Sequence, residues 1–450
     1  MYVSVRKVFS FIQDNSLNRN FITNTFINFL TRFGAIAINL LMVPLLLIVV
    51  GKEKFGIWQT ILAFLSWASL LNFGLGNGLR NLITKLLTEN KTDEIGLAVS
   101  SALKVITKIV FFAGMIIIPV IYFFLNPNKL FLNNQIPSYE IINAFTVFAV
   151  FFLLNIILGI SNSIAFGFQK SAIVGITNIV HLFLCYVIIL VSNYCLQLNL
   201  VELAFIFGGV QSLILFTSFI WQIRKFKIKI DLQRKYQLNS VYKLSGYFFA
   251  AQLLGILFLS IDNFVISINL GAEQTAEFSI ISKIFYAIIG VFSVLLIQLW
   301  NSVTEANLRN DNKWIIKIAK RLAIFAFLIF ICSAVLSSFK DSLLHFWLGN
   351  QFIDIPYISF FLFSFYTFLH CLNSIIANIQ NGLGQLKFQI ISTTLSLAIY
   401  IIGCFVFNIK DLGYNYLIIL KIVGTALAFG VNLISIRELK SSLSKINKTI

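Results

Sequence analysis

The sequence predicts an all-α fold, a polytopic membrane protein with about 12 transmembrane helices in two pseudo-symmetric six-helix bundles. The composition is 58% hydrophobic and 11% charged, against about 45–50% and 25% in soluble domains, so lipid must form part of the solvent. Apolar runs of the roughly 20 residues that cross a bilayer recur from Thr25 to Ile436. Short motifs also recur in the two halves of the chain.

Helices are the predicted element throughout, because they pair all their backbone groups internally in lipid. The breaks between the apolar runs carry charged or turn residues, such as Gly51-Lys52-Glu53-Lys54 and Asn126-Pro127-Asn128-Lys129. The predicted helices are 25–50, 57–80, 103–125, 141–163, 173–193, 202–222, 244–270, 277–300, 319–339, 356–378, 388–408 and 414–436.

The basic residues predict the orientation of these helices. If the N-terminus is cytoplasmic, 26 of the 34 Lys and Arg residues fall at the cytoplasmic side, five outside and three within helices. Cytoplasmic loops carry the excess of positive charge in membrane proteins, so we expect an even number of spans with both termini in the cytoplasm. The net charge of +17 therefore records topology and does not indicate a nucleic-acid partner.

Weak internal repeats predict how the helices are grouped. Gly51–Trp58 aligns with Gly271–Phe278, Asn81–Thr84 with Asn301–Thr304, and the sequence at Gly167 with that at Gly384, at offsets of about 217 to 220 residues. Six helices per repeat give both halves the same orientation, and such transporters place the substrate path between the halves. The predicted organisation is a cytoplasmic lead-in 1–24, an N-lobe 25–222, a basic linker 223–243, a C-lobe 244–436 and a basic tail 437–450.

Signatures of enzymes are missing from the sequence. It contains no H-E-x-x-H, no G-x-x-x-x-G-K-[ST] and no nucleophile elbow. Its five cysteines form no C-x-x-C and predict neither a zinc site nor a disulfide framework. We therefore expect a protein that is not an enzyme, with no catalytic residue, metal or cofactor.

Charged residues inside predicted helices are the candidate functional residues, since each costs about 2.5–3.5 kcal/mol unless it faces a cavity or a partner. Arg32, Lys283 and Lys421 are cations of this kind, and Asp262 is a carboxylate in the outer half of its helix. We expect them to line a hydrated, net-positive cavity that binds an anionic substrate, unless the long cations reach the nearer interface. Asp262 is either a structural partner for a cation or a coupling residue that carries protons. Arg80 is an entrance contact or an ordinary cytoplasmic anchor.

The motif Phe55-Gly56-Ile57-Trp58 is followed by the glycine-rich segment 71–81 and by Ile261-Asp262-Asn263-Phe264. With these motifs the chain resembles the O-antigen (Wzx-type) oligosaccharide flippases of the multidrug/oligosaccharidyl-lipid/polysaccharide exporter superfamily. The resemblance covers nearly the whole chain through short motifs. Asn72 stands where many relatives have an aspartate, which removes a carboxylate that could couple transport to protons.

The resemblance implies two six-helix bundles around a cationic cavity in the bacterial inner membrane. It implies transfer of sugar repeat units linked to undecaprenyl pyrophosphate from the cytoplasmic to the periplasmic leaflet, for surface polysaccharide (O-antigen or capsule) synthesis. Cations of the first and eighth helices, here Arg32 and Lys283, are then substrate contacts. The implied partners are the lipid-linked oligosaccharide, membrane lipids, and a polysaccharide polymerase or other assembly proteins.

Three other functions remain open at this point. A cation-coupled multidrug exporter of the same superfamily needs buried carboxylates, and the first six predicted helices contain no carboxylate well inside a span. A membrane polysaccharide polymerase or glycosyltransferase usually has large external loops, whereas the longest one here is 340–355. The third alternative is a structural scaffold for polysaccharide assembly.

Overall fold

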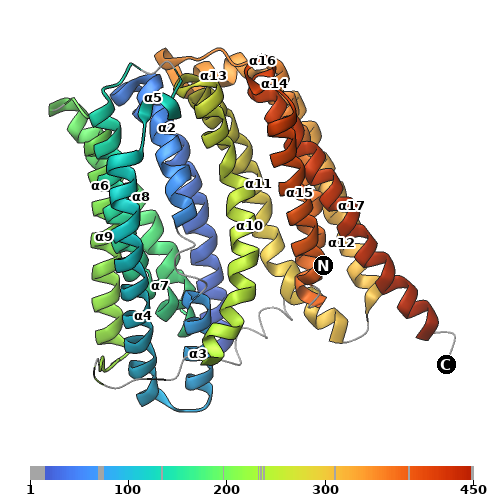
Figure 1. Ribbon diagram of the computed structural model, residues 1–450. Coiled ribbons are helices and arrows are strands. Elements are labelled where there is room, and N and C mark those ends of the chain that lie inside the picture. The colour runs from blue at the N-terminus through green and yellow to red at the C-terminus, as the bar shows by residue number, and fades with distance from the viewer. Residues whose placement is uncertain are drawn as a thin grey trace. The chain divides into compact units, whose positions relative to one another are not determined.

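Helices make up the regular structure of the described part of the chain, which confirms the predicted all-α class (Figure 1). The computed structural model describes residues 16–446 except 69–74, 133–134, 196, 232, 234–235, 237–238, 309–310 and 384–385. Within these residues, eleven helical segments are long and apolar enough to cross a membrane. The predicted helix 57–80 runs over 69–74, outside the described residues, so the count of twelve stays a prediction. The first part of the lead-in, 1–15, and the last four residues of the tail also lie outside.

The elements follow one another in this order: α2 (Ser16–Ala68), α3 (Leu75–Thr88), α4 (Thr92–Pro119), the π-helical turn η2 (Val120–Phe124), α5 (Pro127–Leu130), α6 (Ser138–Leu158), α7 (Ile160–Gly167), α8 (Ser171–Cys195), α9 (Leu200–Lys225), α10 (Asn239–Leu270), α11 (Ala272–Leu308), α12 (Asn312–Ser338), α13 (Lys340–Leu348), the 3-10 turn η3 (Gly349–Gln351), α14 (Tyr357–Leu383), α15 (Leu386–Val406), α16 (Ile409–Leu412) and α17 (Tyr414–Ile446).

Two compact units divide the helices. The first unit comprises the described parts of Met1–Met42, Ala68–Leu125 and Tyr139–Ala250. The second comprises Val43–Trp67, Asn126–Ser138 and the described parts of Ala251–Ile450. The second unit thus includes two segments from the first half of the chain. The predicted lobes 25–222 and 244–436 stay a prediction.

Several helices begin well before the apolar run that predicts them. The run at 103–125 belongs to α4, which begins at Thr92 and includes Asp93 and Glu94 in its first turn. Acidic residues are favourable at a helix N-terminus, and Ile95, Ala98 and Val99 of the same segment are buried. Hydropathy identifies the apolar part of a helix, whereas the helix itself begins earlier, in a segment that is buried inside the unit.

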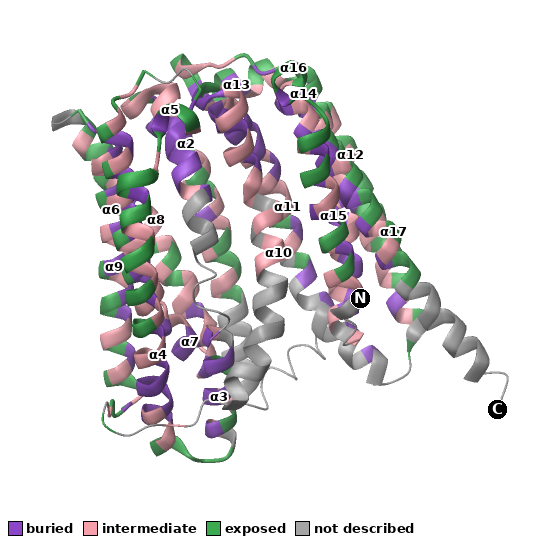
Figure 2. Cartoon of the chain, viewed as in Figure 1, coloured by how far each residue is buried: buried purple, intermediate pink, exposed green. Residues whose placement is uncertain are grey.

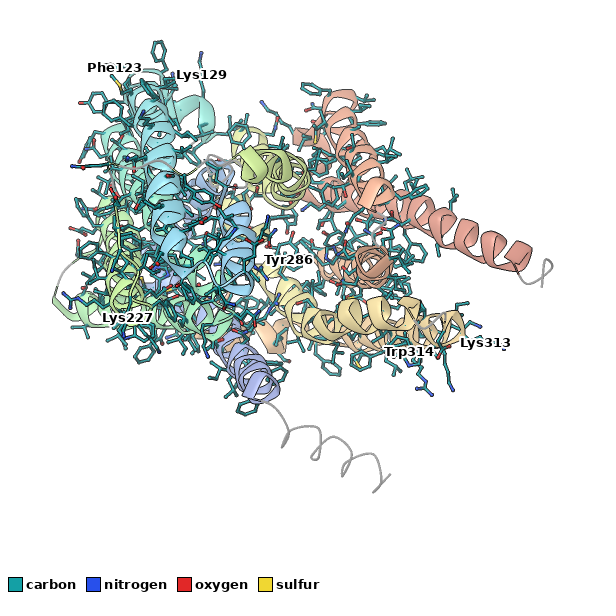
Figure 3. All side chains as sticks on the ribbon, turned by 90° about the horizontal axis from the view of Figure 1, so that it is seen from below. Phe123, Lys129, Lys227, Tyr286, Lys313 and Trp314 are labelled. Carbon is teal, nitrogen blue, oxygen red and sulfur yellow. The ribbon has the colours of Figure 1, made fainter. Side chains whose placement is uncertain are left out.

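Apolar packing inside the first unit joins α3, α4 and α7. Leu79, Ile83, Val99 and Ile164 belong to one buried cluster there. The large apolar side chains that remain exposed lie on faces such as the end of α4 and η2, where Phe123 is 74% exposed and projects outward (Figures 2 and 3). Exposed apolar faces of this extent are expected of helices that face lipid.

Helices α11, α12 and α14 form a buried cluster in the second unit, which includes Phe292, Leu296, Ala326 and Ile375. The short helices α5, α13 and α16 lie together at one end of this unit, at the top of Figure 1. This end carries the segments 51–54, 126–138 and 340–355 that the charge count predicts to be external. We call it the outer end of the second unit.

Two glycine corners stand at the outer end. Gly51 has φ +78° and interrupts α2, and Gly271 has φ +94° and separates α10 from α11. Positive φ is accessible to glycine at little cost, so each corner lets the chain reverse into a new helix. These are the glycines that align in the predicted repeat.

The segments after the two corners pack tightly on each other. Gly56 lies against the backbone of Ala272 and Ala276, and a Cβ at Gly56 would overlap the Ala272 carbonyl group. Lys52 forms ion pairs with Glu277 (2.9 Å) and Glu273 (3.5 Å). The close approach of α2 and α11 therefore depends on the absence of a side chain at position 56.

We expect Gly56→Ala to destabilise the protein by about 1–3 kcal/mol, because the two backbones must separate to admit the methyl group. The measurement is the thermal unfolding midpoint of purified protein in detergent. Gly430→Ala is the matched control, since a Cβ at Gly430 meets nothing within 4 Å and alanine favours a helix over glycine. Equal midpoints for Gly56→Ala and the wild type would contradict the close contact.

Candidate functional site

A buried ion pair joins two of the candidate residues. Asp262 of α10 and Lys421 of α17 form a salt bridge through Oδ2 and Nζ, and each residue is 1% exposed. The other carboxylate oxygen, Oδ1, accepts a hydrogen bond from the Tyr400 hydroxyl of α15 at 2.7 Å. The Lys421 ammonium also donates to the Tyr286 hydroxyl of α11 at 3.3 Å. Four helices of the second unit therefore meet at one pair of charges.

Aromatic rings complete the surroundings of Lys421. Its Nζ lies 5.5 Å from the centre of the Phe258 ring and 5.8 Å from that of Tyr366, and His370 is in ring contact with Tyr366. Cation–π contacts offset part of the cost of removing an ammonium group from water. The positive charge is thus balanced by Asp262 and further stabilised by the rings.

Lys283 is a half-buried cation of the second unit that has no such balance among the described residues. It lies on α11 one helical turn before Tyr286, so both side chains lie on the same side of the helix. Its Nζ is 5.1 Å from the centre of the Phe55 ring of α2. Among the described residues, no carboxylate lies within ion-pair distance of it. Among the described residues its recorded contact is with an aromatic ring, so Lys283 is a candidate contact for an anion.

Gln59 adds an unused polar group near this contact. It follows Phe55 by four residues, which places both on one face of α2. The side chain is 6% exposed, and its Nε2 has no hydrogen-bond partner among the described residues. Buried donors without partners are rare in folded proteins, so this amide is a candidate contact for a ligand.

Arg32 is a candidate cation of the first unit. Its helix, α2, packs on α8 through the adjacent face, where Asn28 donates to the Ser171 hydroxyl at 2.8 Å and Thr31 lies against Gly175. The Arg32 side chain itself is exposed, and no described carboxylate forms an ion pair with it. Its guanidinium is free to bind a phosphate bidentately.

Arg80 is exposed on α3, and its guanidinium lies over the Phe166 ring of α7 at 4.9 Å. The backbone around it is held by Thr84, whose hydroxyl donates to the carbonyl of Gly167 at 3.0 Å. These contacts fix the position of Arg80 at the end of the first unit without neutralising it. Its role as an entrance contact or as an anchor stays a prediction.

The structure therefore brings together some of the five predicted residues and not others. Asp262 and Lys421 form one cluster, and Lys283 is linked to it through Tyr286 on the same helix. Arg32 and Arg80 belong to the first unit. In the described part of the chain, no group of three His, Cys, Asp or Glu side chains could hold a metal ion.

Sequence reasoning missed Phe55, Gln59, Tyr286 and Tyr400. Phe55 stands in the motif that carries the family resemblance, and Tyr286 follows Lys283 by one turn, so both had a local signal. Tyr400 has none, because its partner Asp262 lies 138 residues away. The ion pair likewise joins residues from opposite ends of the second half of the chain.

The chain is similar in sequence to curated bacterial proteins. No protein-family model matches the sequence. The chain is 28% identical over 376 residues to the "Putative O-antigen export protein" of Yersinia pseudotuberculosis, covering 79% of this chain and 82% of that protein. It is 23% identical over 297 residues to the "Putative O-antigen transporter" of Salmonella typhi, covering 64% and 65%.

Solved structures with the same architecture are membrane transporters. An inward-facing multidrug resistance MATE transporter of the MOP superfamily matches with a TM-score of 0.73 at 14% identity, over 91% of this chain and 95% of that one. The lipid II flippase MurJ in an inward closed conformation matches with a TM-score of 0.72 at 15% identity, over 92% of this chain and 87% of that one.

The chain has the fold of the MOP superfamily transporters. The resemblance predicted from the motifs is confirmed, and the relatives of this MOP-fold protein are named as transporters and not as enzymes.

We expect Lys421→Met to lower the stability of this MOP-fold protein by about 3–5 kcal/mol, because it leaves the Asp262 carboxylate buried without a counter-charge. Thermal unfolding in detergent measures the change, with Lys108→Met, at an exposed lysine of α4, as control. The double variant Lys421→Met/Asp262→Asn should regain most of the loss, since it removes both charges. A double variant whose loss equals the sum of the two single losses would show that the pair does not act as a unit.

Proposed function

We propose that this protein is a lipid-linked oligosaccharide flippase. It moves undecaprenyl-pyrophosphate-linked sugar repeat units from the cytoplasmic to the periplasmic leaflet of the bacterial inner membrane, for O-antigen or capsule synthesis. The names of its relatives and the fold shared with a lipid II flippase support a flippase. The observation that carries the proposal is which cations are paired. Among the described residues, Lys421 is neutralised by Asp262, whereas Lys283 and Arg32 form no ion pair.

Two free cations suit the chemistry of a pyrophosphate. Charge-assisted hydrogen bonds from guanidinium and ammonium groups to phosphate oxygens are about twice as strong as neutral ones. In this proposal Lys283 and Arg32 hold the pyrophosphate, Arg80 receives it at the entrance, and Gln59 binds a sugar hydroxyl or a phosphate oxygen. Lys421 acts indirectly, since its ion pair with Asp262 positions Tyr286 and hence the α11 segment that carries Lys283.

A polar path through the protein solves the physical problem of the substrate. Transfer of a sugar hydroxyl from water into hydrocarbon costs several kcal/mol unless the hydroxyl has a hydrogen-bond partner. The polyprenyl tail is apolar and can stay in the lipid. Outward movement of a negative headgroup is favoured by an inside-negative potential, by about 2.3 kcal/mol per charge per 100 mV. We propose alternating access by movement of two lobes. The boundary of the compact units falls within α2 between Met42 and Val43, beside Pro44, which cannot donate a helical hydrogen bond.

We expect Lys283→Ala and Arg32→Ala each to reduce surface polysaccharide roughly tenfold to hundredfold, which corresponds to about 1.5–3 kcal/mol for a hydrogen bond to a charged group. The assay is surface polysaccharide in a strain that lacks its own flippase, with the membrane level of each variant measured in parallel. Lys283→Arg should retain most of the activity because it keeps the charge.

Lys108→Ala is the control, since it removes an exposed lysine of α4 outside the proposed site. Wild-type polysaccharide in both the Lys283→Ala and Arg32→Ala strains would overturn the assignment of the substrate site.

A second candidate, a cation-coupled multidrug exporter, is favoured by the MATE transporter's structural match. The carboxylates of the chain argue against an exporter of cations. Asp262 and Glu140 are the buried carboxylic residues among those described. Asp262 is paired with Lys421, and Glu140 accepts a hydrogen bond from the Leu200 backbone at 3.0 Å. A cationic drug would find no free carboxylate there and would meet Lys283.

Overexpression should therefore leave the resistance of a drug-sensitive strain to cationic dyes and drugs unchanged, within twofold in the minimal inhibitory concentration. A MATE exporter expressed to the same level is the positive control. A clear rise in resistance that is lost in Asp262→Asn would favour the exporter over the flippase.

A further inference from the structure

An apolar groove of about 220 Å³ opens on the second unit between α12, α14 and α17. Its walls are almost entirely aliphatic and include Ile316, Ala319, Ala323, Ile376 and Phe429. A cavity of about 150 Å³ is already large enough to accept a benzene ring. Two of the lining residues, Ala319 and Ala323, are small and lie one turn apart on α12.

Lysines follow one edge of this groove. Lys320 is part of its lining, and Lys313 and Lys317 precede it at the spacing that places all three on one face of α12. All three side chains are exposed, and none forms an ion pair with a described residue. Lys313 and Trp314 lie at the margin of the second unit, at the start of the helix (Figure 3).

Within α12 these lysines have no carboxylate to balance them. Asp311 caps the helix and accepts a hydrogen bond from the Trp314 backbone N–H at 3.0 Å, beside Lys313 in the first turn. No Asp or Glu occurs within α12 itself, so Lys317 and Lys320 have no carboxylate on their own helix. The positive-inside rule accounts for basic residues at this end of the helix, but it does not account for a lysine stripe that borders a preformed apolar groove.

The depth of Lys320 in the membrane indicates which leaflet the groove faces. The 30 Å hydrocarbon core corresponds to about 20 helical residues, so a span that begins at Ser338 at the outer end leaves the core near residue 318. Lys320 therefore lies near the boundary between acyl chains and headgroups. By the charge count this is the boundary that faces the cytoplasm.

We propose that this groove binds an anionic phospholipid of the cytoplasmic leaflet. One acyl chain lies along Ala319, Ala323 and Phe429, and the phosphate contacts Lys320 and Lys317. Anionic lipids dominate the charge of the cytoplasmic leaflet and attract lysines near its surface. The bound lipid supplies a negative charge beside Lys317 and Lys320, which no carboxylate within α12 balances.

This lipid site is separate from the cations proposed to bind substrate. Lys283 lies 25 residues before the end of α11 at Leu308, about 38 Å along the axis, and Lys320 lies about 12 Å into α12. The two helices run in opposite directions, so the two ammonium groups differ in depth by about 25 Å. The proposal does not depend on the flippase function, and its test uses binding alone.

Native mass spectrometry of the full-length protein, extracted in detergent and titrated with lipids, tests the proposal. Phosphatidylglycerol should bind more tightly than phosphatidylcholine with the same acyl chains. Lys320→Gln should weaken phosphatidylglycerol about fivefold, and Lys317→Gln/Lys320→Gln about twentyfivefold, which follows from about 1 kcal/mol per lysine near the surface. Phosphatidylcholine binding should change little. Lys108→Gln, at an exposed lysine of α4, is the matched control.

A second pair of variants tests the groove itself. Ala323→Phe fills the groove and should reduce binding of both lipids at least tenfold, whereas Val335→Phe, at an exposed position of the same helix, should not. Equal binding of the two lipids, a loss in Lys320→Gln no larger than in Lys108→Gln, or unchanged binding in Ala323→Phe would each overturn the proposal. Displacement of phosphatidylglycerol by an equimolar polyprenyl phosphate would also overturn it, in favour of a substrate-tail site.

Discussion

The cost of a charge in a lipid-embedded helix bundle is the constraint on which the second unit depends. Asp262 and Lys421 are both removed from water and balance each other, and Tyr400 and Tyr286 use the remaining hydrogen-bonding capacity of the pair. Two ions buried together are costly unless geometry and hydrogen bonds are favourable. Such a pair accepts few alternative arrangements, so it ties the relative positions of α10, α11, α15 and α17.

Because Asp262 neutralises Lys421, the other lysines of the second unit must be considered separately. With Lys421 occupied, Lys283 on the neighbouring helix is the cation that contacts an aromatic ring and lacks a carboxylate among the described residues. The same reasoning distinguishes Lys320 of α12, which is exposed and borders an apolar groove. Lysines of one unit thus lie in three different surroundings, and the nearest side chains distinguish them.

The outer end of the second unit shows how local backbone chemistry supports this arrangement. Gly51 and Gly271 adopt positive φ, and the segments that follow them meet at Gly56 and Ala272 without an intervening side chain. Ser267 donates to the Leu130 carbonyl at 3.0 Å, which fastens the segment 126–138 to the end of α10. These contacts hold α2 against α11, and hence Phe55 beside Lys283.

Sequence alone determined the membrane class, the approximate positions of the helices and the candidate cations, because hydropathy and charge cost act on each residue locally. The start of α4 at Thr92 could not be predicted, because its first turns precede the apolar run and are stabilised by burial of Ile95 and Val99 in the tertiary structure. The motif at Phe55 was visible, but its contact with Lys283 was not. Only the tertiary structure decided which cation is neutralised and which is free, because that depends on Asp262 and Lys421, residues 159 positions apart that packing brings within ion-pair distance.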